Sequence, residues 1–428
     1  MFGTGCRYIL NNTKSNIQSE IDFLFLGGFF PKQLESEIAQ KSRTGLQNAA
    51  NVFQWHIING IEKNIKKPID LLSFLFVGSY PKNYSDFFIH GEKFKRLDNR
   101  ENKIGGFLNL SIIKQLLLPF FVKRELKKWI YKHEGKKVIF IYSLQNHFLS
   151  AANYLKTKDS EIHICISVND LPVYMSMDRD ASFLFRIYKK WSEHKLKTNL
   201  KYIDSFMFVT VNMVEYFRIY NKPYVVIEGM VDYCNTNELV MVDNSIFARK
   251  NIILYTGTLT KKYGILDLVE AFSLIKDENY RLIICGGGET EEQIKKAATE
   301  DNRIKFMGLT ARNKVLELQK EATVLVNPRQ NNEEFTKYSF PYKMFEYLLS
   351  GKPIVCYKLD GFPEEYDNHF IYVNGSKPND LAEKLVEACN LSENELRKIH
   401  KSNIKFVVEE KNNVVQSKKI IDMIKKTL

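Results

Sequence analysis

The chain has 428 residues, which exceeds one ordinary hydrophobic core and predicts two domains of about 200 residues each. Hydrophobic residues make up 44% and charged residues 26%, which is the balance of a folded protein. No run reaches the roughly 18 apolar residues of a membrane-spanning helix, and we expect no secretory signal at the start. The cysteines have no metal-ligand spacing, so we expect buried free thiols in a reducing cytoplasm.

The positive charge is concentrated in the first half of the chain. Residues 1–235 contain 33 Lys and Arg against 22 Asp and Glu, whereas residues 236–428 contain 29 against 28. A net charge of +11 on one half predicts an anionic partner for that half. Nucleic acid and an anionic membrane surface are the two candidates.

The second half alternates short apolar runs with segments of helical spacing. Because the apolar runs are continuous, they predict a parallel sheet covered on both faces, with ligands beyond the carboxyl ends of its strands. The expected strands are 251–255, 280–285, 304–307, 323–327 and 353–357, and the expected helices are 266–275, 291–299, 313–321 and 342–349.

The first half predicts a similar but less regular α/β domain. Strands are expected at 22–26, 71–77, 138–142, 162–168, 206–211 and 224–227, and a helix near 43–51. A polar stretch at about Cys234–Lys250 predicts the boundary, giving domains 1–234 and 235–428. The Lys-rich tail from Ser392 is expected to be helical and to be able to pack back on the first domain.

The segment from Phe340 to Val355 contains residues suited to a nucleotide. Lys343 and Glu346 are three positions apart and therefore share a helix face. A carboxylate there can accept hydrogen bonds from ribose hydroxyls, and a lysine near helix-start amides can hold a phosphate. An ordinary amphipathic helix with a surface Lys–Glu pair would contain the same residues.

This segment, with Val326–Arg329 before it, resembles the donor-site signature of the retaining GT-B glycosyltransferases of family 4. It is most similar to members that build bacterial capsule or exopolysaccharide. The resemblance implies two Rossmann-like domains facing a cleft, with Glu346 on the ribose and the loop at Ser339, Phe340 and Pro341 supplying amides to the diphosphate. Tyr338 stands where the family has its first glutamate, so the contact to the sugar is expected from Tyr338, Ser339 or backbone. Loss of activity is the competing interpretation.

A second match spans residues 256–264, which resemble the family's strand, loop and helix that neutralise the diphosphate. The family's arginine and lysine positions hold Thr258 and Tyr263 here. Lys261 or Lys262 is expected to take over, although a solvated lysine pair is an equal alternative. The donor-binding set implied by the resemblance comprises Gly257, Lys261, Lys262, Gly287, Phe306, Arg329, Tyr338, Ser339, Phe340, Pro341, Lys343 and Glu346.

The first half offers fewer candidates. Gly27 and Gly28 follow the first predicted strand, where the family has a glycine turn on the acceptor side. His147 and Asp170 follow two later strands and are the candidate catalytic residues, although a lone histidine near a loop is more often structural.

The run Ile112–Val138 mixes apolar residues with eight Lys or Arg, and Arg186–Lys201 contains more. This pattern is typical of docking on an anionic lipid surface. A core-facing helix with a solvated basic face is equally compatible, and no nucleic-acid-binding motif is present.

Together these features predict a cytoplasmic, hexose-transferring enzyme, peripheral on the inner membrane face. The resemblance implies transfer of a sugar from a UDP-linked nucleotide sugar to a lipid-linked oligosaccharide, with no cofactor and no metal. The alternatives are a non-catalytic GT-B subunit that binds a partner or acceptor, and a nucleotide-sugar epimerase of GT-B shape.

Overall fold

The computed structural model describes residues 21–43, 46–96, 100, 102–171, 183–232 and 251–428. Contacts divide the chain into two compact units, each described by itself below. Unit 1 is Met1–Ile227 with Asn413–Leu428, and unit 2 is Glu228–Asn412. The polar stretch Cys234–Lys250, which the sequence analysis proposed as the boundary, lies outside the described residues.

Unit 1 is built on an eight-stranded sheet in which every strand except β4 is parallel to its neighbours. Its central strands are buried apolar runs, as in β7, where Val138–Tyr142 are all buried. In spatial order the strands are β10 (Tyr224–Val226), β9 (Ser205–Phe208), β8 (His163–Val168), β7 (Lys136–Tyr142), β1 (Ile21–Gly27), β2 (Asp70–Ser73), β5 (Asn102–Ile104) and β4 (Glu92–Phe94). A separate antiparallel pair joins β3 (Phe88–Ile89) to β6 (Phe107–Leu108).

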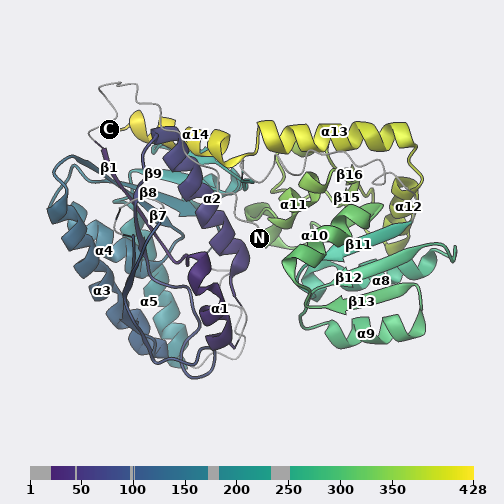
Figure 1. Ribbon diagram of the computed structural model, residues 1–428, viewed down its shortest axis with the longest axis horizontal. Helices are drawn as coiled ribbons and strands as arrows, with labels where there is room; N and C mark the ends of the chain where they lie inside the picture. Colours follow the sequence, from purple (N-terminus) through teal and green to yellow (C-terminus); the bar gives the residue numbers. More distant parts are fainter. Residues whose placement is uncertain (1–20, 44–45, 97–99, 101, 172–182, 233–250) are drawn as a thin grey trace. The chain divides into compact units, whose positions relative to one another are not determined.

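Helices cover both faces of this sheet (Figure 1). One layer contains α3, α4 and α5, which contact one another in sequence order, and the other contains α2 and α14. The helices of unit 1 are α1 (Lys32–Lys41), α2 (Asn48–Ile65), α3 (Ser111–Lys132), α4 (Asn146–Lys156), α5 (Phe183–Leu200), α6 (Asn212–Phe217) and α14 (Asn413–Lys425).

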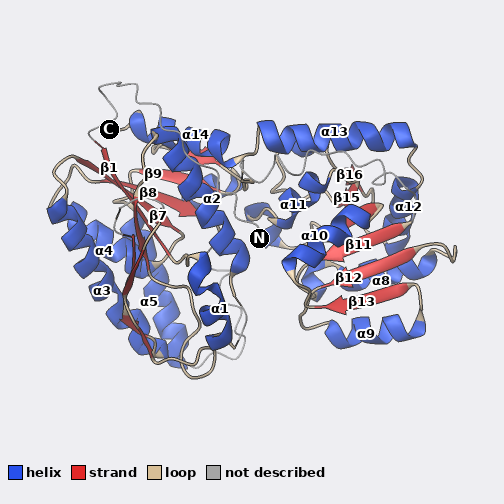
Figure 2. Cartoon of the chain, viewed as in Figure 1, coloured by secondary structure: helices blue, strands red, loops and turns tan. Residues whose placement is uncertain are grey.

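Unit 2 contains a six-stranded, fully parallel sheet, shown in red in Figure 2. The strands, in spatial order, are β13 (Ile304–Gly308), β12 (Arg281–Cys285), β11 (Ile252–Thr256), β14 (Val324–Asn327), β15 (Ile354–Cys356) and β16 (Ile371–Tyr372). The helices are η2 (Lys261–Tyr263), α8 (Ile265–Leu274), α9 (Glu291–Glu300), α10 (Arg312–Glu321), η3 (Glu334–Tyr338), α11 (Lys343–Ser350), η4 (Glu364–Tyr366), α12 (Pro378–Cys389) and α13 (Glu393–Glu409).

Both units are Rossmann-like, which confirms the predicted α/β fold class. In unit 2 the chain order of the strands across the sheet is 3-2-1-4-5-6, the doubly wound order of dinucleotide-binding folds. All the strands and helices expected in this half form, each within two residues of its expected bounds. Gly351 ends α11 in the left-handed region at φ 67°, as its place before Pro353 predicts.

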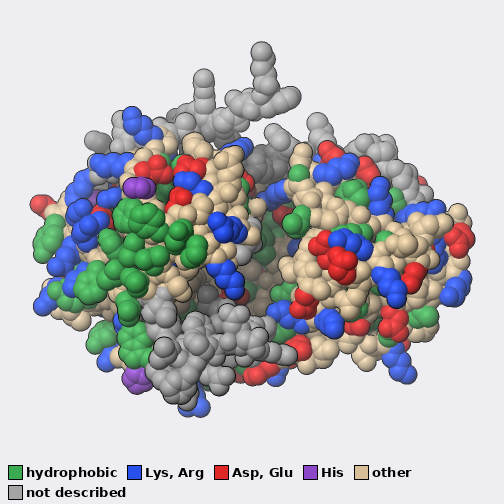
Figure 3. Space-filling model, turned by 90° about the horizontal axis from the view of Figure 1, so that it is seen from below, with side chains coloured by type: hydrophobic (Ala, Val, Ile, Leu, Met, Phe, Trp, Pro, Cys, Tyr) green, Lys and Arg blue, Asp and Glu red, His purple; other side chains and the backbone are tan. Residues whose placement is uncertain are grey.

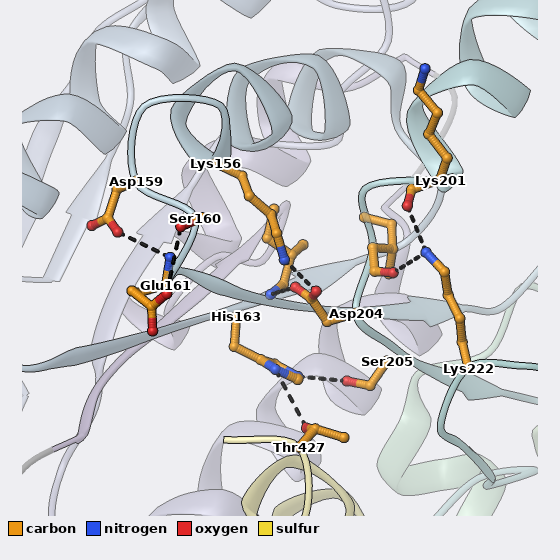
Figure 4. Close-up of polar contacts among 12 residues, drawn as sticks. Lys156, Asp159, Ser160, Glu161, His163, Lys201, Asp204, Ser205, Lys222 and Thr427 are labelled. Atoms are coloured by element: carbon orange, nitrogen blue, oxygen red, sulfur yellow. Dashed lines mark hydrogen bonds and ion pairs between the residues drawn. The ribbon is translucent and has the colours of Figure 1, made fainter.

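The last helix, α14, belongs to unit 1 although it is the most distant segment in sequence. Thr427 lies 3.4 Å from the Nδ1 atom of His163 on β8, whose Nε2 atom lies 2.9 Å from the Ser205 hydroxyl on β9 (Figure 4). Burial lowers the pKa of His163, so the neutral ring is favoured between these two hydroxyls. Lys156 and Asp204 form an ion pair beside this contact.

The four described cysteines, Cys165, Cys285, Cys356 and Cys389, are buried free thiols as expected. Cys6 and Cys234 lie outside the described residues. No described helix combines the length and the apolar composition that a bilayer crossing needs.

The close packing of α14 against α2 at Gly60 can be tested by substitution. A Cβ at Gly60 would overlap the Asn413 carbonyl oxygen and the Ser417 hydroxyl of α14. Gly60→Leu should therefore lower the free energy of unfolding of unit 1 by about 1–3 kcal/mol through overpacking. The three tryptophans, Trp55, Trp129 and Trp191, all lie in unit 1, so urea unfolding followed by tryptophan fluorescence reports on that unit.

The matched control is Ala49→Leu, at an exposed position of the same helix, which should leave the urea midpoint nearly unchanged. Equal midpoints for the Gly60→Leu variant and the original chain would contradict close packing of α2 on α14.

Candidate functional site

The topology of unit 2 fixes where a ligand can bind. The chain leaves β11 toward β12 on one side, and β14 lies on the other side of β11, so the strand order reverses between β11 and β14. In open α/β sheets ligands bind beyond the carboxyl ends of the strands at this point. The loop from Gly257 follows β11, and Pro328 and Arg329 follow β14.

Two glycines bring the loops at this edge close together. Gly286, after β12, has φ 147°, and a Cβ there would overlap the Gly257 carbonyl oxygen. Gly264, before α8, has φ 74°, and a Cβ there would overlap the Pro328 carbonyl oxygen. Only glycine allows the backbone at these two positions to come so close to the neighbouring loops. The loops therefore pack backbone against backbone around the end of β11.

Lys343, the first residue of α11, points its ammonium group at the end of β11. The Nζ atom donates to the Thr256 carbonyl oxygen at 3.2 Å and lies 4.1 Å from the centroid of the Tyr255 ring. Tyr347, one turn later, places its hydroxyl 3.0 Å from the Thr256 amide and so holds the helix against the strand. Burial, with a further contribution from the charge of Arg329, lowers the pKa of Lys343 well below its usual value.

Arg329 brings a second cation to the same edge from the end of β14. Its guanidinium lies 4.1 Å from the centroid of the Tyr263 ring, and its Nη1 atom lies 3.4 Å from the Ser339 hydroxyl. The side chain is buried, and its Nε–H has no hydrogen-bond partner among the described residues. Burial lowers its pKa, but a guanidinium remains charged in proteins.

No carboxylate of the described residues forms an ion pair with Lys343 or Arg329. Two cations held near each other and away from water are unfavourable unless an anion joins them. The edge of the sheet can therefore accommodate a negatively charged group, and the buried Nε–H of Arg329 has no hydrogen-bond partner among the described residues.

Glu346 lies one turn after Lys343 and is paired with a residue that the sequence analysis did not select. Its Oε1 atom is 2.8 Å from Nη2 of Arg312, at the start of α10. The Arg312 side chain is 56% exposed and that of Glu346 is 24% exposed. An ion pair this exposed contributes only about 0–1 kcal/mol to stability. A ligand can therefore displace Arg312 from the Glu346 carboxylate at a small cost in free energy.

An exposed leucine lies beside the glycine loop that follows β12. Leu309 directly follows β13 and is 89% exposed. A Cβ at Gly287 would come within 3.2 Å of the Leu309 side chain, so the absence of a side chain at Gly287 leaves room above it. Phe306, the predicted donor contact on the same strand, is instead partly buried against the core of unit 2.

The lysines at 261 and 262 lie in the loop after β11, and Lys262 shares the Tyr263 and Phe335 rings with Arg329. Lys261 is exposed, and its backbone amide donates to Glu289 at 3.1 Å. Lys262 lies over the Tyr263 and Phe335 rings, at 5.3 and 5.5 Å from their centroids. Lys343 and Arg329 add basic side chains to this edge of the sheet, and Tyr263 provides a ring that Arg329 contacts.

The loop before α11 has a mixed role. Ser339 contacts Arg329, and Tyr338 is half-buried at the end of η3. Phe340 is a core residue, with its ring 4.8 Å from Tyr366 and 5.0 Å from Phe362, so only its backbone can face a ligand. Pro341 has no amide hydrogen and cannot donate to a phosphate, which corrects its predicted role to one of shaping the loop.

The unit 1 candidates lie in surroundings that differ from the predicted ones. A Cβ at Gly27 would overlap Gln54, and a Cβ at Gly28 would overlap Phe76. The Gly28 amide donates a hydrogen bond to the Gln54 side-chain oxygen at 2.9 Å. These glycines are therefore required by packing inside the unit. Asp170 is exposed just beyond β8.

His147 lies in the first turn of α4 and is 7% exposed. Its ring lies 4.3 Å from the Phe148 ring, and Nε2 has no partner among the described residues. Burial, with a smaller contribution from the Lys114 charge, lowers the pKa of His147 to about 3. A buried ring in its neutral form does not support the predicted catalytic role, because a general base must reach the proton it removes.

Across the described ranges, no group of three His, Cys, Asp or Glu side chains is arranged to hold a metal ion.

Comparisons with known proteins give one family match and several similar solved structures. The family described as "Glycosyl transferases group 1" matches residues 250–390, which include Lys343, Arg329 and Glu346. No curated protein sequence matches the chain.

Several solved structures are similar over nearly the full chain. A UDP-forming α,α-trehalose-phosphate synthase from Burkholderia xenovorans, in complex with glucose-6-phosphate, has a TM-score of 0.65 at 11% identity and covers 94% of this chain and 100% of its own. The lipopolysaccharide outer core galactosyltransferase WaaB and the Anabaena protein HepE in complex with UDP each have a TM-score of 0.59 at 13% identity, covering 95% of this chain and 100% of their own. At these identities the likeness establishes the fold, which is GT-B.

Arg312 and Leu309 were missed in the sequence because neither is part of a recognisable motif. Arg312 is 34 positions from Glu346 and meets it only because α10 and α11 are neighbours. One feature of the sequence could have indicated them. Both follow the turn at Gly308, which lies at the carboxyl end of a predicted strand, where ligands bind in such sheets.

The buried His147 predicts a pH dependence of stability. Its pKa is about 3 in the folded chain against an ordinary value of 6.5, so below pH 6.5 the unfolded chain binds a proton that the folded chain does not. Stability is then lost as pH falls from 6.5, at about 1.4 kcal/mol per pH unit for this group. His147→Gln should make the loss between pH 7 and pH 5 smaller by about 2 kcal/mol.

The measurement is urea unfolding at both pH values, followed by tryptophan fluorescence. His90→Gln, at an exposed position of unit 1, is the control for removing a surface histidine. An unchanged pH dependence in the His147→Gln variant would show that the ring is protonated without difficulty in the folded chain.

Proposed function

We propose that this chain is a retaining glycosyltransferase that moves a sugar from a nucleotide-sugar donor, UDP-linked, to a lipid-linked glycan in polysaccharide biosynthesis. The observation that carries the proposal is the pair of cations at the switch point of unit 2, Lys343 and Arg329, with no bound carboxylate among the described residues. These residues lie within the segment that matches a glycosyltransferase family.

The parts of a nucleotide sugar correspond to separate features of this edge. The diphosphate would lie between Lys343 and Arg329, with the Arg329 Nε–H as one donor. Glu346 would leave Arg312 and accept hydrogen bonds from the ribose hydroxyls. The nucleobase would lie over Gly287 against the exposed Leu309, whose apolar surface is otherwise in water.

In the proposed reaction, the bond between the anomeric carbon and the diphosphate oxygen breaks, and an acceptor hydroxyl oxygen bonds to that carbon from the same face. The acceptor proton passes to the departing diphosphate oxygen, so no separate protein base is needed. Charge develops on that oxygen in the transition state, and Lys343 and Arg329 stabilise it from fixed positions. This scheme agrees with the buried, neutral state of His147.

The choice of UDP and of a lipid-linked acceptor draws support from proteins of the same fold. One is described as UDP-forming, one was solved with UDP, and one is a lipopolysaccharide galactosyltransferase. The enzyme would act in the cytoplasm, at the inner face of the membrane. The direct test is incubation with UDP-linked hexoses and detection of released UDP. No release from any donor, together with no UDP binding by calorimetry, would favour the non-catalytic subunit.

Lys343→Met should remove turnover while leaving the fold intact. Loss of one fixed donor to the developing charge typically lowers kcat by about 10²–10³-fold. Because the variant also removes a partly buried amine that no carboxylate of the described residues neutralises, its thermal midpoint, measured by circular dichroism, should stay level or rise. The matched control is Lys261→Met, an exposed lysine of the same sheet edge, whose rate should stay within about threefold.

If Lys261→Met lowered turnover as strongly as Lys343→Met, the diphosphate would contact the loop after β11. That result would contradict the proposed position between Lys343 and Arg329.

Glu346→Ala should weaken UDP binding by about tenfold or more, since a hydrogen bond to a charged group contributes about 1.5–3 kcal/mol. Calorimetry with UDP and with 2′,3′-dideoxy-UDP separates the ribose contact from other effects. If Glu346 binds the ribose hydroxyls, the variant and the original chain should bind the dideoxy compound equally. Glu317→Ala, on the exposed face of α10, is the control.

A loss of affinity for both compounds alike would place Glu346 elsewhere in the site. UDP affinity retained within about twofold would remove the ribose assignment altogether.

A further inference from the structure

Helix α3 exposes an apolar face that packing does not require. Ile113, Leu116, Leu117 and Phe120 are 45%, 52%, 37% and 68% exposed, and their spacing places them on one side of the helix. The opposite side is also apolar, with buried residues at positions 118, 122, 126 and 129. The buried side accounts for the docking of α3 on the unit. We name the four exposed residues the α3 stripe.

Two further exposed aromatic residues lie at the same end of the helix. Tyr80 and Phe87 are 37% and 59% exposed, and their ring centroids are 6.2 Å apart. Tyr80 forms a bridge with Leu110, immediately before α3, and its amide donates to the Asn109 carbonyl oxygen at 2.9 Å. The stripe and this aromatic pair therefore share one end of unit 1, and contiguous apolar surface of this kind marks an interaction site.

Cations follow the stripe directly along the helix. Arg124 and Lys128 have exposed side chains, and Lys123 lies 3.3 Å from the centroid of the Tyr154 ring. Helix α3 contains six Lys or Arg and a single acid, Glu125, whose buried side chain pairs with Lys103, Arg124 and Lys128 and so offsets only part of this charge. The exposed side of α3 thus changes from apolar to cationic within one turn after Phe120. Figure 3 shows hydrophobic side chains gathered on unit 1 with Lys and Arg beside them.

We propose that the α3 stripe and the Tyr80–Phe87 pair dock unit 1 on an anionic lipid bilayer. The apolar side chains would enter the boundary between headgroups and acyl chains, and the cations one turn away would meet the anionic headgroups. The excess of 33 Lys and Arg over 22 Asp and Glu in residues 1–235 extends the same complementarity. A nucleic acid would satisfy the cations but would leave the stripe in water. The proposal stands apart from the transferase activity.

The side chains of residues 186–190, which contribute to the second basic run of the sequence, lie outside the described part of the chain. The proposal does not use them.

The test is sedimentation of the full-length chain with vesicles. Binding is expected on phosphatidylcholine vesicles that contain about one quarter phosphatidylglycerol, to decline as salt rises, and to be at least tenfold weaker on phosphatidylcholine alone. Leu116→Ser with Phe120→Ser should reduce binding to the anionic vesicles at least tenfold. Arg124→Gln with Lys128→Gln should reduce the preference for anionic lipid and its salt dependence.

The matched control is Leu274→Ser with Lys296→Gln, an exposed apolar residue and an exposed cation of unit 2, which should bind as the original chain does. All substituted side chains are exposed, so unchanged tryptophan fluorescence and unchanged UDP affinity should accompany the loss of vesicle binding. This separates failure of docking from failure of the transferase assignment.

Three results would overturn the proposal. The first is equal binding to neutral and anionic vesicles, and the second is full binding by the Leu116→Ser, Phe120→Ser variant. The third is a concentration-dependent dimer, seen by light scattering without lipid and abolished in that same variant, which would assign the stripe to a second copy of the chain.

Discussion

Two basic side chains packed at the end of β11 in unit 2, Lys343 and Arg329, are the constraint around which this edge of the sheet is arranged. Lys343 reaches the end of β11 from a helix, and Arg329 reaches the same place from β14 across an aromatic ring. Such charges reduce the stability of a folded protein unless an anion accompanies them. Their retention at a ligand-binding switch point is most simply explained by a function that supplies the anion.

This arrangement also accounts for the departures from the family pattern in the loop after β11. The family places cations where Thr258 and Tyr263 stand, and here Tyr263 serves as the ring under a cation that comes from a different strand. Tyr338, in the place of a glutamate, directly precedes Ser339, whose hydroxyl contacts Arg329.

The two units use their glycine turns differently. In unit 2 the turns at Gly264 and Gly286 bring backbone to backbone around the end of β11, whereas in unit 1 Gly27 and Gly28 make room for the side chains of Gln54 and Phe76. A glycine in the turn after a strand looks the same in sequence in both cases. Unit 1 instead differs from unit 2 in its surface, where α3 has a second apolar side that no part of the described chain covers.

The sequence by itself determined the strands and helices of unit 2, because continuous apolar runs between glycine and proline turns leave few alternatives. It also determined Glu346 and Lys343 as site candidates, since three positions on a helix share a face. It did not reveal β3 to β6, which are two or three residues long and have no readable period. Only the tertiary structure selected Lys343 and Arg329 over Lys261 and Lys262, paired Arg312 with Glu346, buried His147 and joined α14 to unit 1. Each of these depends on contacts between segments distant in the chain, and local spacing contains no information about which side chains the fold will remove from water.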